Sequence, residues 1–161
     1  GGARVKPSRA ALLVVLLAAG CVGRGDVRER PAEWEEIPCG NCLVTVYGTI
    51  YVPPGRLAEF TTPPLAPATE ALLAHEMVHV ERQRDGGAAG AAMWHARYFY
   101  DRAFRWGEER VAYEREIEVL RQRGGVARRA DVLEAVLSPI YAGMAGREEA
   151  GKWLDGLGII R

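Results

Sequence analysis

The sequence predicts one predominantly helical α+β domain, and three observations lead to this prediction. Residues 43–52 alternate in side-chain character with a period of two, as β-strands do. From Pro67 onward, several segments repeat apolar residues every three or four positions, as amphipathic helices do. The chain has 161 residues, 48% of them hydrophobic, which suits one domain with a modest core.

The first twenty residues have the features of an export signal. Arg4, Lys6 and Arg9 precede the uncharged apolar stretch 10–19, which is too short to cross a bilayer as a helix. Small residues then lead into Cys21, and this pattern resembles the lipobox of bacterial lipoproteins, whose cysteine becomes the lipidated first residue. We expect residues 1–20 to be a signal peptide and Cys21 to carry a membrane anchor. The alternative is an ordinary signal peptide that happens to be cut near a cysteine.

Residues 21–38 contain glycines, prolines and scattered charges, so we expect a tether that leads into a single domain at 39–161. Cys39 and Cys42 are separated by two residues, and in an exported protein this spacing predicts a disulfide between them. Two zinc ligands or a redox pair are the alternatives. A zinc ribbon needs a second such pair, and a thioredoxin-type pair should open a helix rather than a strand.

The first regular element is expected to be a strand from Leu43 to Val52, ended by the turn residues 53–55. One face would carry Val44, Val46, Ile50 and Val52, and the other Thr45, Tyr47, Thr49 and Tyr51. A hairpin partner is expected from Trp34 to Ile37 or from Leu57 to Thr61.

The first helix is expected to begin near Pro67 or Thr69 and to run to about Arg84, because Asp85-Gly86-Gly87 ends it. Its core face is expected to carry Leu73, Met77, Val80 and Arg84. Further helices are expected at about 89–105, 107–122 and 130–142, with a short one from Arg147 to Leu157.

Charge excludes one class of partner. Lys plus Arg equals Asp plus Glu, at 21 each, so the chain has no electrostatic footprint for nucleic acid. We therefore expect no nucleic-acid binding.

The run His75-Glu76-Met77-Val78-His79 carries the chemistry of the first helix. Histidines four residues apart lie one turn apart on the same helix face, so both rings can reach one metal ion. Glu76 borders that face and can take a proton from a water molecule that the metal activates. This pattern favours a zinc hydrolase with His75 and His79 as ligands and Glu76 as general base and acid. The alternative is a pair of structural histidines on an alanine-rich helix.

A catalytic zinc ion usually has a third protein ligand and an open position for water. The metzincin pattern requires glycine at position 82 and histidine at 85, where this chain has Arg82 and Asp85, so that class is excluded. The residues alone leave three candidates: Asp85, His95, and a glutamate in the segment 107–121.

Thirty residues after His79 comes the run Glu109 to Tyr113. Together with the HExxH motif it resembles the gluzincin family of zinc metallopeptidases, in which a downstream helix supplies a zinc-binding glutamate followed by a small residue three positions later. The resemblance implies Glu109 as the third ligand, Ala112 as the small residue that lets the helices approach, and Tyr113 near the metal. The span 68–120 also looks like small bacterial and phage-borne zincin-like proteins.

Many gluzincins have an aspartate where this chain has Tyr113, and Glu116 is the residue we expect to orient a histidine ligand instead. Glu108 and Glu114 remain rival metal ligands. Tyr113 is the first candidate for stabilising the negative charge of the transition state, ahead of His95 and Tyr98.

We therefore expect an exported mini-zincin, lipid-anchored in the bacterial envelope at the outer membrane or facing the periplasm, that hydrolyses peptide bonds in proteins or in peptidoglycan. The alternative is a non-enzymatic envelope lipoprotein with a structural or degenerate zinc site, closed by a fourth ligand such as Asp85 or His95. A third class is a thiol redox protein built on Cys39 and Cys42.

Overall fold

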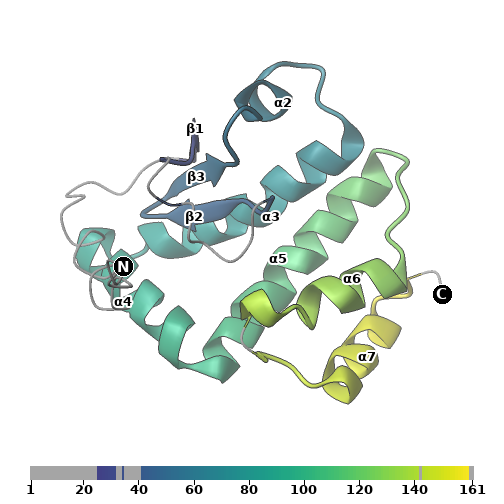
Figure 1. Ribbon diagram of the computed structural model, residues 1–161. Coiled ribbons are helices and arrows are strands. Elements are labelled where there is room, and N and C mark those ends of the chain that lie inside the picture. The colour runs from purple at the N-terminus through teal and green to yellow at the C-terminus, as the bar shows by residue number, and fades with distance from the viewer. Residues whose placement is uncertain (1–24, 32–33, 35–40, 142, 160–161) are drawn as a thin grey trace, which may run out of the picture.

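The computed structural model describes residues 25–31, 34, 41–141 and 143–159. The described chain is mostly helical with a small three-stranded sheet, which confirms the predicted fold class (Figure 1). The elements in chain order are β1 (Asp26–Glu29), β2 (Val44–Val46), β3 (Thr49–Val52), α2 (Leu57–Thr61), α3 (Pro67–Arg84), α4 (Gly87–Tyr100), α5 (Arg102–Gln122), α6 (Arg129–Val136), the 3₁₀ helix η2 (Pro139–Tyr141) and α7 (Arg147–Gly156).

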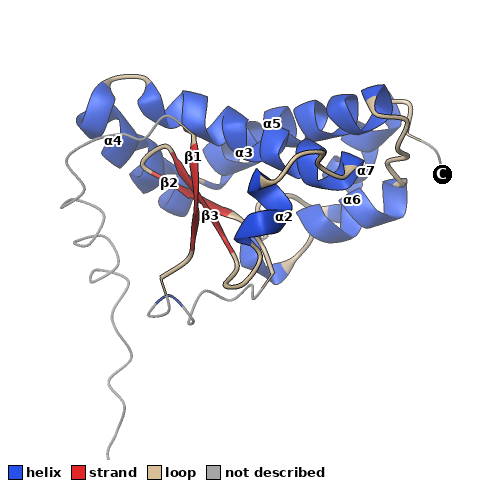
Figure 2. Cartoon of the chain, turned by 90° about the horizontal axis from the view of Figure 1, so that it is seen from above, coloured by secondary structure: helices blue, strands red, loops and turns tan. Residues whose placement is uncertain are grey.

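Helices α3 and α5 form the centre of the molecule and run antiparallel to each other (Figures 1 and 2). Ion pairs join them at both ends: Arg123, directly after α5, lies 2.8 Å from Glu70, and Arg82 lies 3.7 Å from Glu108. The sheet covers one side of α3, and α6 with α7 covers α5. Side chains that face each other between α3 and α5 are therefore enclosed on both sides.

The sheet has the order β1-β3-β2, with β1 parallel and β2 antiparallel to β3. Strand β1 lies inside the segment 21–38 that the sequence suggested was a tether, so Asp26–Glu29 belongs to the folded domain instead. The expected hairpin partner at Leu57–Thr61 is wrong, because that segment forms the short helix α2. In the other expected partner, residues 35–37 lie outside the described residues.

The predicted single strand from Leu43 to Val52 is in fact a hairpin. Tyr47 and Gly48 both have positive φ angles, 48° and 71°, as the two central residues of a type I′ turn do. Thr45 pairs directly with Ile50, and paired residues point to the same face of an antiparallel sheet. Thr45 therefore faces the same side as Ile50, which contradicts the two faces predicted for one continuous strand.

Two predicted helix boundaries also differ. The break expected near residue 106 occurs at Asp101, whose side chain accepts a hydrogen bond from the backbone N–H of Phe104 and caps α5. The helix expected to reach 142 ends at Val136, since Pro139 has no N–H to donate and restricts the residue before it. Helix α3 has the predicted bounds, and α7 ends within one residue of its predicted end.

The two larger of the three apolar clusters among the described residues hold the layers together. One lies between the sheet and α3, and contains Leu43, Ile50, Val52, Phe60 and Val80, with Leu73 and Met77 packed against it. The other joins α5 to the C-terminal helices and contains Trp106, Tyr113, Ile117, Leu133, Val136, Met144 and Leu154 among others. Arg84, which was expected on the core face of α3, is exposed.

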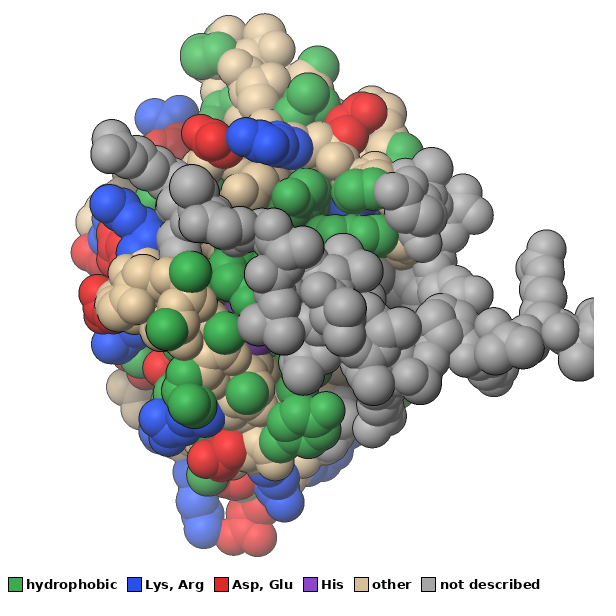
Figure 3. Space-filling model, turned by 90° about the vertical axis from the view of Figure 1, so that its left-hand side faces the viewer, with side chains coloured by type: hydrophobic (Ala, Val, Ile, Leu, Met, Phe, Trp, Pro, Cys, Tyr) green, Lys and Arg blue, Asp and Glu red, His purple; other side chains and the backbone are tan. Residues whose placement is uncertain are grey.

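The surface near α4 mixes apolar and charged side chains (Figure 3). Met93, Phe99 and Tyr100 on α4 are all exposed, at 63%, 48% and 72%. None of the helices in the described part of the chain is both long and apolar enough to span a bilayer.

Candidate metal centre

Helix α3 presents its two histidines toward α5 rather than toward solvent. His75 and His79 are 4% and 5% exposed, and their ring centroids lie 5.1 Å apart, one helical turn along the same face. The buried face of α3 is polar for most of its length, since Glu76 and Gln83 are buried as well.

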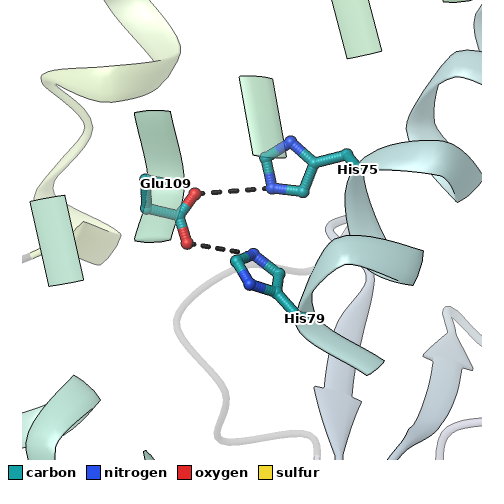
Figure 4. Close-up of side chains that lie close together, drawn as sticks. All are labelled: His75, His79 and Glu109. Carbon is teal, nitrogen blue, oxygen red and sulfur yellow. Dashed lines mark ion pairs between the residues drawn. The ribbon is translucent and has the colours of Figure 1, made fainter. Parts of the chain in front are cut away.

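Glu109 on α5 lies opposite the two histidines (Figure 4). Its Oε2 atom is 3.4 Å from Nε2 of His75, and its Oε1 atom is 3.2 Å from Nε2 of His79. Glu109 is only 1% exposed, and one ligand atom from each of the three side chains lies within 4.8 Å of the others. The third ligand implied by the resemblance is thus next to both histidines.

These three side chains can hold a metal ion. Two ligand atoms bound at about 2.0–2.1 Å to a tetrahedral zinc ion lie about 3.3–3.4 Å apart, close to the two N–O distances above. Glu109 Oε2 has no hydrogen-bond partner although it is buried. A buried carboxylate oxygen with no partner is costly, and a cation between the rings would satisfy it.

The charges of the cluster are strongly coupled. Burial alone raises the pKa of Glu109, but interactions with His79 and His75 outweigh this effect and hold the pKa well below its usual range. Burial alone lowers the pKa of His75, but the interactions with the carboxylates of Glu109 and Glu116 outweigh this effect and raise it to about 10. With this raised pKa, His75 carries an additional proton at neutral pH. A metal cation bound between His75 and Glu109 would replace that proton.

Glu116 lies on the far side of the His75 ring, where the sequence places an orienting carboxylate. His75 Nδ1 lies 3.0 Å from Glu116 Oε2. A hydrogen bond donated by Nδ1–H fixes the tautomer that leaves Nε2 for a metal. This contact is the one expected of Glu116.

Glu76 lies beside the cluster but outside it. The hydroxyl of Thr45 on β2 donates a 2.6 Å hydrogen bond to Glu76 Oε2, and both side chains are buried. This bond holds the Glu76 carboxylate through Oε2. The contact of Thr45 with Glu76 was not predicted, because the alternation of residues 43–52 assigned Thr45 to the wrong face of the sheet.

Gln83 locks the hairpin to α3 and was also missed. Its amide donates to the carbonyl of Thr45 over 3.1 Å, and its carbonyl accepts from the backbone N–H of Gly48 over 2.9 Å. Gln83 is fully buried. Gln83 lies one turn beyond His79 on the same face of α3, and this spacing could have indicated that its side chain is buried as well.

Helix α4 supplies an aromatic wall next to His79. Trp94 and Tyr98 stack with ring centroids 4.7 Å apart, and both rings lie near that of His79. The Tyr98 hydroxyl donates a short hydrogen bond to Glu109 Oε1. Tyr98 was considered as a transition-state donor, but its contact with a metal-ligand candidate was not foreseen.

The rival ligands are in other environments. Asp85 is exposed at the C-terminal end of α3. His95 Nε2 accepts a hydrogen bond from the backbone N–H of Tyr47 over 3.3 Å.

The two rival glutamates of α5 each accept a hydrogen bond from a tryptophan ring. Glu108 accepts from Trp94 Nε1, and Glu114 accepts from Trp153 Nε1. Among the described residues, the three-membered group of His75, His79 and Glu109 is the one arranged to hold a metal.

Tyr113 lies close to the cluster, with its ring edge-on to His75 at 4.7 Å between centroids. Its hydroxyl is 3.2 Å from that of Tyr141, a residue that the sequence analysis did not single out. Burial, with smaller contributions from nearby carboxylates, raises the pKa of Tyr113, so the hydroxyl keeps its proton at neutral pH. Ala112 is fully buried in the same helix, as expected of a small residue in a helix contact.

Cys21 and Cys39 lie outside the described residues, so the expected lipidation and the expected disulfide with Cys42 stay predictions.

Comparison of the chain with protein-family profiles, curated proteins and solved structures finds no match.

Proposed function

We propose that this protein is a zinc-dependent hydrolase that cleaves peptide bonds. The observation that carries the proposal is the buried carboxylate of Glu76, held by Thr45 beside the cluster of His75, His79 and Glu109 without being part of it. A purely structural metal site needs no second carboxylate in that position, whereas hydrolysis needs a base next to the metal.

Zinc is the metal that we infer from the donor set. Two imidazole nitrogens and one carboxylate oxygen form the His₂Glu set of several zinc peptidases. The set contains no thiolate, which would favour softer ions, and too few oxygens for calcium or magnesium.

The residues divide the work of hydrolysis between them. Zinc, when bound, supplies a Lewis acid that polarises a carbonyl and lowers the pKa of water to about 7. Glu76 takes the proton of the attacking water on Oε1 and delivers it to the leaving amine, while Thr45 keeps Oε2 in place. Tyr113, whose hydroxyl stays protonated, is our candidate donor to the negative charge that develops on the substrate carbonyl.

We propose a protein, a peptide or the peptide cross-links of peptidoglycan as the substrate class, because the N-terminal sequence is typical of a protein exported to the bacterial envelope. Cys21 is the proposed lipidation site. Gly25 is the fourth residue after it, at a distance of at most about 14 Å along the chain, so a lipid at Cys21 would keep the domain close to the membrane.

The competing function is that of an envelope lipoprotein with a structural metal. A closed structural site requires a fourth protein ligand. Asp85 and His95, the residues that could close it, have the other environments described above, and this favours an open, catalytic site.

The test compares wild type with Glu76→Gln in zinc content and in cleavage of a generic protein and of peptidoglycan. We expect equal zinc content and a loss of at least about 100-fold in cleavage rate. Glu81→Gln, an exposed change on the same helix, is the matched control and should keep the wild-type rate. Equal cleavage by wild type and Glu76→Gln on every substrate would contradict the proposed enzyme.

A further inference from the structure

The two oxygens of Glu109 have different surroundings. Oε1 accepts the hydroxyl hydrogen of Tyr98 and faces Nε2 of His79 over 3.2 Å, whereas Oε2 accepts no hydrogen bond and faces Nε2 of His75 over 3.4 Å. A donor on one carboxylate oxygen draws electron density from it and fixes the direction in which the other oxygen points. The environment of Glu109 is thus asymmetric before any metal arrives.

The Tyr98 hydroxyl is held in place from several directions. The ring stacks on Trp94 with an interplanar angle of 18°. Arg105 donates from Nη1 to the backbone carbonyl of Tyr98 over 2.6 Å, and its guanidinium carbon lies 5.9 Å from the centre of the ring. Because ring and backbone are both fixed, the hydroxyl has little freedom to leave Glu109.

We propose that Tyr98 is a positioning residue that makes Glu109 a one-oxygen ligand of the metal. This inference rests on the proposed metal site and adds a role for a residue on a third helix. Oε1 already accepts the hydroxyl hydrogen of Tyr98, so Oε2, which accepts no hydrogen bond, is the stronger ligand of the two and the ligand set is two nitrogens and one oxygen. A tetrahedral ion then keeps one position for water or substrate, which hydrolysis requires. Without Tyr98, Oε1 could bind the metal as well and fill that position.

The test is Tyr98→Phe in the full chain, loaded with zinc. The phenylalanine ring keeps the stacking on Trp94 and the contact with His79, so only the hydroxyl is removed. We expect zinc K-edge absorption to show one more bound protein oxygen than in wild type, and competition with a chelator to show affinity lower by about 10- to 100-fold. Tyr141→Phe is the matched control, since its hydroxyl lies against Tyr113 rather than a ligand, and should leave both values unchanged.

Wild-type coordination and affinity in Tyr98→Phe would overturn the inference. A structure of the zinc-loaded wild type offers a check that does not depend on the variant folding, because two bound oxygens from Glu109 would also overturn it. If the wild type binds no zinc, the proposed function itself fails. If the wild type binds zinc and Tyr98→Phe behaves identically, only the role of Tyr98 fails.

Discussion

Thr45 on β2 and Glu76 on α3 are joined by a buried 2.6 Å hydrogen bond, 31 residues apart in the chain. This bond connects the sheet directly to the residue proposed as the catalytic base. It gives the small sheet a role beyond covering one side of α3, because the position of the hairpin determines how the Glu76 carboxylate is held.

Thr45→Val tests that role. Valine keeps the shape of threonine but cannot donate, so Glu76 loses its partner while the metal ligands are untouched. Hydrogen bonds to charged groups contribute about 1.5–3 kcal/mol, so we expect kcat/KM to fall about 10- to 100-fold with unchanged zinc affinity. Thr49→Val is the control. Thr49 is as buried as Thr45, but it lies on β3, where it pairs with Val46. Equal losses in both variants would mean that Thr45 acts only through packing.

Gln83→Met should weaken both the fold and the site. The change keeps the volume but leaves the Gly48 N–H and the Thr45 carbonyl without their partners. Each unsatisfied buried group costs about 1–3 kcal/mol, so we expect the free energy of unfolding in urea to fall by about 2–6 kcal/mol. Gln122→Met, on the exposed side of α5, should change it by less than about 0.5 kcal/mol. A fully stable Gln83→Met protein would rule out this clamp.

His95 should make the protein less stable in acid. Burial, assisted by the charge of His79, lowers the pKa of His95 to about 4, below its usual 6.5. As pH falls below 6.5 the unfolded chain binds a proton that the folded protein refuses, so stability is lost down to about pH 4. Between pH 7.5 and 5 this loss is about 2 kcal/mol. Urea unfolding at pH 7.5 and pH 5 measures this loss. The free energy of unfolding should fall more between the two pH values in wild type than in His95→Gln, and an equal fall in both proteins would contradict the prediction.

The sequence predicted the parts of the site that depend on helical spacing. His75 and His79 repeat at one turn, and Glu109 and Glu116 follow on a second helix, so local periodicity was enough to find them. The bounds of α3 were predictable for the same reason, since a proline near its start and a glycine pair after its end mark them.

What the sequence did not predict depends on contacts between distant segments. The positive φ angles of Tyr47 and Gly48 turn one apparent strand into a hairpin and reverse the face on which Thr45 lies. The role of Gln83 and the contact of Tyr98 with Glu109 were not predicted, because their partners are a backbone turn and a carboxylate on other elements. Apolar periodicity also misjudged the buried face of α3, where polar side chains occupy much of the interior.

The most direct test of the metal site is a zinc titration of the full chain and of Glu109→Gln, with bound metal counted per chain. Glu109→Gln removes the one ligand charge, and Glu114→Gln on the exposed face of α5 is the matched control. We predict one zinc ion per chain in wild type and in Glu114→Gln, and binding at least about 100-fold weaker in Glu109→Gln, since the ligand loses its charge. A wild-type chain that binds no zinc, or a Glu109→Gln chain that binds it with wild-type affinity, would contradict the proposed centre.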